Sequence, residues 1–336
     1  MTIHVINVGQ GNCIFVEGPR ASGKRTTMIF DGGKEARGFE IIDYLKSIGY
    51  PPGSKIDYMV VSHKDADHFE GFIKLLEEGY KIGAFYDNGS KKNQVDYDST
   101  LIPLVENQSD KMYTMKPGYN FNIGNGALVT CMVSAGNILG GKVISNLSEN
   151  DKSIGLLFEY GEFEFFSAGD LGGGEFSEDK SCTHRSTGQK NIESPLLEAM
   201  LDEGFIDKQD GIEILHVSHH GSESSTNYEF MNGLSPAVAV LSVGLNQSKS
   251  YEHPRVDIVE SVLMAKANCI TAKPALVLQT EDGLNSTKTS NKGFAVGDIV
   301  IDVFNSGNYR ISATGKLMSN YDERSKVGLP ITLRVD

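Results

Sequence analysis

The sequence of 336 residues has four cysteines and no apolar run long enough to cross a membrane. A transmembrane helix needs about 20 predominantly apolar residues, so we expect no membrane span. Met1–Val5 enters a strand at once, so we also expect no signal peptide and predict a cytoplasmic protein. No two cysteines have C-x-x-C spacing, which argues against a cysteine zinc site and predicts reduced thiols. The cysteines are Cys13, Cys131, Cys182 and Cys269.

Positive charge is also scarce. Lys and Arg number 31 against 44 Asp and Glu, which gives a net charge of −13. Because phosphate neutralisation needs Lys and Arg, this balance disfavours nonspecific binding to long nucleic acid and favours nucleotides or short single strands. Neither a strong basic tract nor an RNP-like aromatic run is present. Candidate phosphate contacts are Lys64, Lys91, Lys92, Lys152 and Arg255.

Metal-binding side chains are concentrated in the segment His63–His68, which has the pattern H-x-D-x-D-H. The preceding run Ile56–Val61 is apolar and β-branched, which predicts a buried strand, and the apolar positions from Phe69 onward have helical spacing. In a strand-to-helix loop the alternate residues can face one way, toward one point. Imidazole and carboxylate ligands suit zinc, manganese or iron. The alternative is a solvated charged loop.

A second cluster follows another predicted strand, at His219-His220-Gly221-Ser222. A His-His pair alone is more often structural than ligating, but five of the eight histidines lie in His63–His68 and in residues 212–222, which favours metal binding. Between the segments, a strand over 163–169 ends in Gly169-Asp170. A carboxylate there can bridge two metals roughly 3.5–4 Å apart. The alternative for Asp170 is a turn or a helix cap.

These residues resemble the metallo-β-lactamase fold superfamily, specifically the hydrolase domain of ComEC-type DNA-uptake competence proteins. The combination of H-x-D-x-D-H and H-H-G-S in this order is specific, whereas Gly-Gln-Gly alone is not. Without a membrane span, the chain is similar to a soluble, stand-alone form of that domain. The segments that carry the resemblance span residues 3–312 and are Asn7–Asn12, Phe30–Gly33, Ser62–His68, Asn150–Ser153 with Ser167–Asp170, and Ser218–Ser222 with Tyr251–Pro254.

The resemblance implies an α/β fold, an αββα sandwich of two mixed β-sheets flanked by helices. We predict one hydrolase domain over residues 1–314, a lid or insertion at 171–192 and a C-terminal extension over 315–336. The alternation of strands and helices after an antiparallel start agrees with this architecture. We expect a helix over 254–266, and late strands at 275–280, 297–304 and 308–312 that complete the second sheet.

The resemblance also implies a ligand set for two divalent ions, zinc or manganese. The superfamily's middle histidine is missing from Glu149–Ser153, so either an oxygen ligand replaces it or one ion is held weakly. Asp31, Asn150 and Ser153 are expected to support the ligands from behind. The expected metal ligands are His63, Asp65, Asp67, His68, Asp170 and His219.

The predicted chemistry is phosphodiester hydrolysis in nucleic acid or nucleotides. A metal pair lowers the pKa of a bound water and stabilises charge on the attacked oxygen. Asp67 is expected to orient the nucleophile, and His220 or His253 to donate a proton or bind a phosphate oxygen. For His253, a structural role before Pro254 is the alternative. Hydrolysis of an ester, lactone or β-lactam, or a non-catalytic nucleotide- or DNA-binding role, stays open, as does a homodimer or a protein partner.

Overall fold

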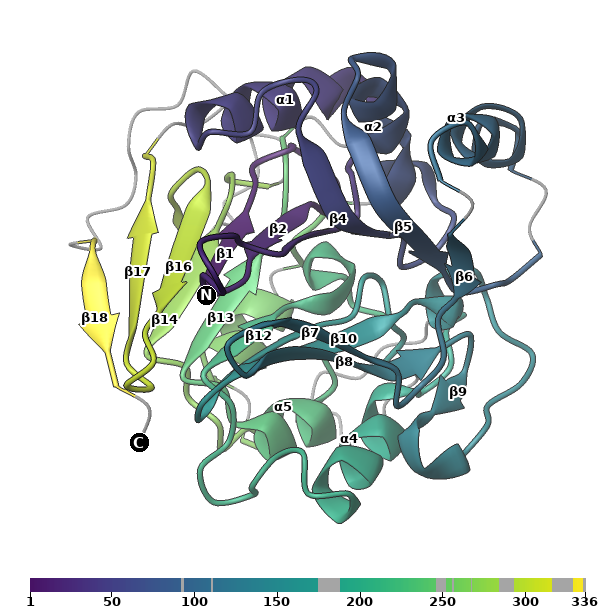
Figure 1. Cartoon of the computed structure of the whole chain (residues 1–336). Coiled ribbons are helices and arrows are strands. Elements are labelled where there is room, and N and C mark those ends of the chain that lie inside the picture. Colours follow the sequence, from purple (N-terminus) through teal and green to yellow (C-terminus); the bar gives the residue numbers. More distant parts are fainter. Residues whose placement is uncertain are drawn as a thin grey trace.

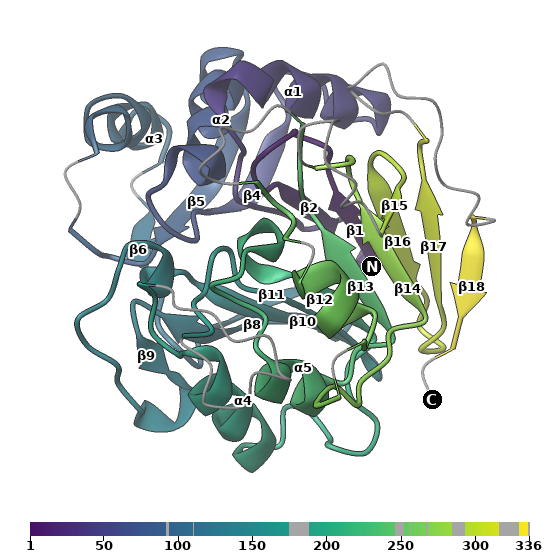
Figure 2. The same ribbon diagram turned by 180° about the vertical axis from the view of Figure 1, so that it is seen from behind.

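The chain folds into two β-sheets packed face to face, with helices over both outer faces (Figures 1 and 2). The computed structural model describes residues 1–91, 94–109, 111–174, 188–245, 252–255, 257–266, 268–283, 293–315 and 329–334. Both sheets contain parallel and antiparallel neighbours, so the predicted αββα sandwich of mixed sheets is confirmed.

The first sheet contains nine strands from both ends of the chain. They are β1 (Thr2–Val5), β2 (Ile14–Glu17), β3 (Thr27–Phe30), β4 (Lys55–Val60), β5 (Lys81–Asp87), β6 (Met112–Thr114), β16 (Ile299–Val303), β17 (Tyr309–Ala313) and β18 (Ile331–Leu333). Their order is β18-β17-β16-β1-β2-β3-β4-β5-β6. The strands from β3 to β6 are parallel, so their carboxyl ends lie at one edge.

The second sheet is formed by the middle of the chain. Its strands are β7 (Asn120–Gly124), β8 (Ala127–Ser134), β9 (Asn137–Ile138), β10 (Gly155–Tyr160), β11 (Phe163–Ser167), β12 (Ile214–His216), β13 (Val238–Leu241), β14 (Leu276–Gln279) and β15 (Phe294–Ala295). Their order is β15-β14-β13-β12-β11-β10-β8-β7, with β9 beside β8. The strands from β11 to β15 are parallel.

Helices cover the two outer faces. Figure 1 shows α1 (Gly38–Ser47), α2 (Ala66–Glu77) and α3 (Ile102–Glu106) over the first sheet, and α4 (Glu193–Asp202) and α5 (Tyr228–Leu234) over the second. In α2 the buried Phe69, Phe72, Ile73 and Leu76 recur at helical spacing and form its inner face. Short helical turns are η1 (Glu35–Arg37), η2 (Tyr97–Leu101), η3 (Leu139–Gly141), η4 (Asn150–Lys152), η5 (Ser218–Gly221) and η6 (Asp257–Leu263).

The apolar core has three parts, one between the sheets and one under each helical layer. Alternation along a strand divides its side chains between layers. In β2, Ile14 and Val16 pack between the sheets, whereas Phe15 packs in the cluster that contains the apolar faces of α1 and α2. The strands are therefore anchored on both faces, which holds the loops at their ends in place.

Two predictions about the second half of the chain were wrong in detail. The strands expected at 297–304 and 308–312 join the first sheet, where β16 pairs antiparallel with β1 and Ile3 lies opposite Ile301. This pairing covers an edge of β1 that would otherwise be open. Only β14 and β15 of the late strands extend the second sheet. In place of the α-helix expected over 254–266, the described residues form the π-helical turn η6.

Other sequence-based expectations met mixed outcomes. Within the described residues, no helix combines the length and apolar character needed to cross a bilayer. Cys13 and Cys131 are free and buried, but Cys269 is disulfide-bonded, so the expectation of reduced thiols was wrong for Cys269. Cys182 lies outside the described residues, as do residues 175–187 of the predicted lid. From the predicted extension, β18 pairs with β17.

Candidate metal centre

The predicted ligands meet where parallel strands from both sheets end. In the first sheet, Asp31 follows β3 and His63 lies three residues after β4. In the second sheet, Asp170 lies three residues after β11, and η5, which contains His219 and His220, lies after β12. The carboxyl ends of parallel strands are common positions for functional groups, because the loops there converge.

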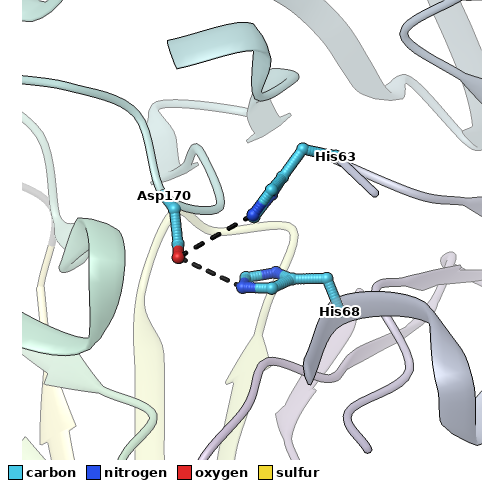
Figure 3. Close-up of side chains that lie close together, drawn as sticks. All are labelled: His63, His68 and Asp170. Carbon is cyan, nitrogen blue, oxygen red and sulfur yellow. Dashed lines mark ion pairs between the residues drawn. The ribbon is translucent and has the colours of Figure 1, made fainter. Parts of the chain in front are cut away.

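Asp170 is at the centre of the cluster. Its Oδ1 lies 3.1 Å from His68 Nε2 and its Oδ2 lies 3.8 Å from His63 Nε2. Figure 3 shows the imidazole of His63, from the loop after β4, and that of His68, from the start of α2, pointing at the carboxylate of Asp170 from the second sheet. The tandem histidines complete the ring of nitrogens, with His219 Nε2 3.5 Å from Oδ2 and His220 Nε2 3.6 Å from Oδ1. Each carboxylate oxygen therefore faces two imidazoles.

Four buried polar atoms in this cluster have no hydrogen-bond partner. They are His63 Nε2, His68 Nε2, His220 Nε2 and Asp170 Oδ1. An unsatisfied buried polar atom costs about 1–3 kcal/mol, so four of them at one point require an explanation. Ligand atoms of His63, His68 and Asp170, and likewise of Asp67, His68 and His220, lie within 4.8 Å of one another. The residues present therefore fit divalent metal ions.

The imidazoles are held by their other ring nitrogen. His68 Nδ1 lies 2.8 Å from Asp31 Oδ2, and His220 Nδ1 donates to the Ser242 carbonyl oxygen at 2.8 Å. His63 Nδ1 contacts the hydroxyls of Ser62 and Ser153 at 3.1 and 3.2 Å. A proton on Nδ1 leaves the Nε2 lone pair directed at Asp170, as in metal-ligating histidines.

Asp31 and Ser153 contact the ligands from behind, and Ser153, which contacts both His63 and Asp170, links the two halves of the centre. Asp31 accepts hydrogen bonds from the Ser62 backbone at 2.7 Å and from its hydroxyl at 2.8 Å. Ser153 Oγ accepts a hydrogen bond from the Asp170 backbone N–H at 3.1 Å. Both residues thus lie behind the expected ligands, and their supporting role stays a prediction.

The tandem histidines depend on an unusual backbone. His219, His220 and Gly221 have φ values of 51°, 53° and 74°, all in the left-handed region. Two consecutive non-glycine residues in this region are strained, and such strain is often found at functional sites. Because of this turn, both neighbouring imidazoles reach Asp170 instead of diverging.

The segment that lacks the expected histidine also reaches the centre through an asparagine. Asn150, on η4, has its Nδ2 3.3 Å from His219 Nε2. On the opposite side, His219 Nδ1 contacts Gln189 Oε1 at 3.0 Å and Ser224 Oγ at 2.7 Å. Gln189 belongs to the described end of the predicted lid, and the sequence analysis did not identify it. Asp65, which is partly exposed, has Oδ2 3.6 Å from His63 Nε2.

Charges in the centre reinforce one another. Burial opposes ionisation of Asp170, but His219, His68 and His220 outweigh it and hold its pKa well below the usual range. Burial alone would lower the pKa of His68, yet Asp170 and Asp31 raise it. For Asp67, burial raises the pKa, but the contact with His220 and the charges of His68 and His220 together outweigh it and lower the pKa. Asp67 and Asp170 are therefore ionised at neutral pH and available to cations.

A cavity of about 330 Å³ opens over these residues. Its lining includes Asp67, Asp170 and both tandem histidines. His253 also lines the cavity, where burial, followed by the charges of His219 and His220, lowers its pKa. Three further lining residues, which the sequence analysis did not predict for the site, are Gln10, Lys34 and Gln94.

No family model matches the chain. The chain is similar to ComE operon protein 3 of Bacillus subtilis, with 21% identity over 273 residues that cover 77% of this chain and 30% of that protein. The chain thus spans less than a third of that relative's length. This match confirms the resemblance to the competence branch.

Solved structures with a similar fold include the metallo-β-lactamase fold protein YhfI from Bacillus subtilis, at 10% identity and TM-score 0.46, covering 84% of this chain and 95% of that chain. Rm3 metallo-β-lactamase has 12% identity and TM-score 0.35, covering 64% and 77%. These proteins are what the chain is similar to. In this chain, each sheet brings part of a His/Asp cluster to the junction between the two sheets.

Proposed function

We propose that this protein is a metal-dependent phosphodiesterase or nuclease that uses two divalent ions. The observation that carries the proposal is the position of Asp170, whose two oxygens each face two imidazole Nε2 atoms. A carboxylate in this position suits a bridge between two ions. The orphaned buried nitrogens around it support the same assignment.

The contacts divide the proposed ligands into two groups around Asp170. His63, Asp65 and His219 lie on the side of Oδ2 and would hold one ion. Asp67, His68 and His220 would hold the other, with Oδ1. In this assignment His219 supplies the imidazole that is missing from residues 149–153, and His220 is a ligand rather than a proton donor. Each ion would then have two nitrogen donors from histidines and two oxygen donors from aspartates, a set that suits zinc or manganese.

The protein's residues prepare the cavity for an anionic reaction. Two ions held here would supply a water of lowered pKa and a Lewis acid toward the attacked oxygen. Asp67 stays ionised and can orient a nucleophilic water by accepting its hydrogen bond. His253 is kept neutral, which suits it to donate a hydrogen bond to a phosphate oxygen rather than a proton to a leaving group.

The resemblance to the competence branch supports phosphorus as the electrophile. The ligands alone serve a carbonyl equally well, so the decisive test compares substrates. Apo protein reloaded with Mn²⁺ or Zn²⁺ is assayed with bis(p-nitrophenyl) phosphate, labelled single-stranded DNA and a lactone. Asp67→Ala and His219→Ala are compared with the wild type, and metal content is measured for each.

The matched control is His4→Ala, because His4 lies on β1 and contacts Tyr44 and Glu17 away from the cluster. We expect metal-dependent phosphodiester hydrolysis that is lost in both site variants and kept in the control. Bound metal with turnover of the lactone only would replace the proposal with a carbonyl hydrolase. Protein that binds no metal would instead have a binding role.

A further inference from the structure

The cavity is lined by the proposed metal ligands and also by Gln10, Lys34 and Gln94, none of which is a proposed metal ligand. We propose that Lys34 binds a phosphate of the substrate next to the scissile one, so that the preferred substrate carries at least two phosphates in succession, as a nucleic-acid strand does. This inference rests on the proposed phosphodiesterase function and specifies its substrate class.

Three of the five cations predicted as phosphate contacts, Lys64, Lys152 and Arg255, are already engaged in ion pairs, whereas Lys91 is exposed and Lys92 lies outside the described residues. Lys64 Nζ lies 3.6 Å from Asp87 Oδ2 and 4.3 Å from the centre of the Tyr97 ring. Lys152 Nζ lies 2.9 Å from Glu149 Oε2. These pairs use the charge of both lysines, which reduces their availability to a ligand.

Arg255 is engaged in the same way, with Nη1 3.4 Å from Glu252 Oε2 and Nε 3.6 Å from Glu223 Oε2. Lys34, in contrast, is exposed, lines the cavity, and forms no ion pair within the described part of the chain. Its ammonium group is therefore available to an anion that enters the cavity.

The backbone before Lys34 is fastened to the metal centre. Gly32 N–H donates to His68 O at 2.6 Å, and Gly33 N–H donates to Asn12 O at 2.8 Å. Gly71 N–H, on α2, donates to Gly33 O at 3.0 Å. A Cβ on Gly32 would lie 2.5 Å from Phe72 Cδ1, so this close approach requires glycine. Lys34 is thus held at a constant position relative to His68, with only its side chain free to move.

Burial distinguishes the proposed positions of the two phosphates. His68 and Asp170 are buried, so ions held by them would engage the scissile phosphate in the interior, whereas Lys34 is exposed and would meet a phosphate nearer to solvent. Gln10, which also lines the cavity, supplies an independent sign of a ligand, because its Oε1 is buried without a hydrogen-bond partner. A carboxamide oxygen can accept a hydrogen bond from a base or sugar beside the bound phosphate.

The test compares Lys34→Gln with the wild type, both metal-loaded and full length, on two substrates. Bis(p-nitrophenyl) phosphate has a single phosphodiester, whereas a labelled ten-residue oligothymidylate has flanking phosphates. We expect KM for the oligonucleotide to rise about tenfold while its kcat and the turnover of the small diester stay unchanged. A plot of log(kcat/KM) against log[salt] has a negative slope, and this slope should become less steep by about 0.7, the value for one phosphate contact on a single strand.

Two variants make the result specific. Lys34→Arg should restore the KM, because it keeps the charge. Lys81 is an exposed lysine at the amino end of β5, whereas the candidate site lies at the carboxyl ends of the strands. Lys81→Gln should therefore leave KM and the salt slope unchanged. Equal losses on both substrates, or a salt slope that does not change in Lys34→Gln, would overturn the inference. Wild-type protein that cleaves neither phosphodiester refutes the proposed function itself and is recognised before any variant is compared.

Discussion

The two sheets deliver histidines to the same aspartate by different means. In the first sheet, His63 lies in the connection between β4 and α2, and His68 lies in the first turn of α2. In the second sheet, His219 and His220 lie in a turn in which His219, His220 and Gly221 all have a positive, left-handed φ. Both pairs present Nε2 to Asp170. Ligands spaced along a regular connection need no strained backbone, whereas neighbouring residues that must reach one point require it.

The strained turn is held by hydrogen bonds on several sides. His219 N–H donates to Gly169 O at 2.9 Å, and Ser222 N–H donates to His219 O at 2.7 Å. Arg255 N–H donates to Gly221 O at 2.8 Å, which connects the turn to the segment that contains His253. Strain of about 1–3 kcal/mol per residue persists only where the surroundings determine the conformation in this way.

The largest effect is expected at the residue that both pairs share. Asp170→Asn removes the charge that faces all four imidazoles, so we expect loss of both ions and a fall in activity on the order of 10³ or more. Metal content by mass spectrometry and bis(p-nitrophenyl) phosphate turnover measure this. Asp207→Asn, at an exposed turn, is the control. Two ions retained in Asp170→Asn would show that this carboxylate is not the bridge.

Double variants test whether each sheet contributes to both ions. His63→Ala with His219→Ala removes two proposed ligands of one ion, so the protein should keep one ion. His63→Ala with His220→Ala removes a ligand from each, so both affinities should fall, by about 10–100-fold each. Titration calorimetry with Mn²⁺ gives stoichiometry and affinity. Identical behaviour of the two double variants would contradict the proposed division.

A glycine substitution measures the cost of the strained turn. A Cβ on Gly221 would lie 2.8 Å from Pro254 Cβ, and φ is +74°. We expect Gly221→Ala to lower the free energy of unfolding by about 2–3 kcal/mol. Gly53 has φ +92° with no atom within 4 Å of an added Cβ, so Gly53→Ala should cost only about 1 kcal/mol. Urea unfolding of both variants measures these losses of unfolding free energy. Equal losses in Gly221→Ala and Gly53→Ala would show that tight packing around the turn adds nothing to the cost.

The smallest effect concerns a carboxylate pair in the second sheet. Burial, followed by the charges of Glu213 and Glu159, raises the pKa of Glu164 from 4.5 to about 8. Because the folded-state pKa is the higher one, this group's contribution to stability is complete below pH 4.5 and is lost as the pH rises through 8.

Glu164→Gln should therefore be more stable than the wild type at pH 9, by about 1 kcal/mol because the site is partly exposed and screened. The difference should vanish at pH 4. Thermal unfolding at both pH values measures it. A Gln variant that is less stable at pH 9 would show that the charged carboxylate is favoured in the fold.

Local patterns made much of this site predictable. The H-x-D-x-D-H segment, Asp170 and the His-His pair each follow an apolar strand, and the end of such a strand can be recognised without knowledge of the fold. The sequence did not single out Lys34, Gln10 and Gln189, because glutamines and a single lysine carry no pattern. Gln10 and Lys34 line the cavity and Gln189 contacts His219, and these residues come from loops that are distant in sequence. The prediction that the strands at 297–304 and 308–312 join the second sheet was wrong for a similar reason, because the order of strands in a sheet depends on contacts between residues far apart in sequence.

The sequence by itself determined that two segments rich in His and Asp stand at the ends of buried strands, because apolar periodicity and strand termini are local. The tertiary structure alone decided which nitrogen faces which oxygen. His219 and His220 are adjacent in sequence, yet a left-handed turn directs them to opposite oxygens of Asp170. Such a turn is unfavourable for an isolated peptide and forms only where the surrounding hydrogen bonds and packing outweigh its cost.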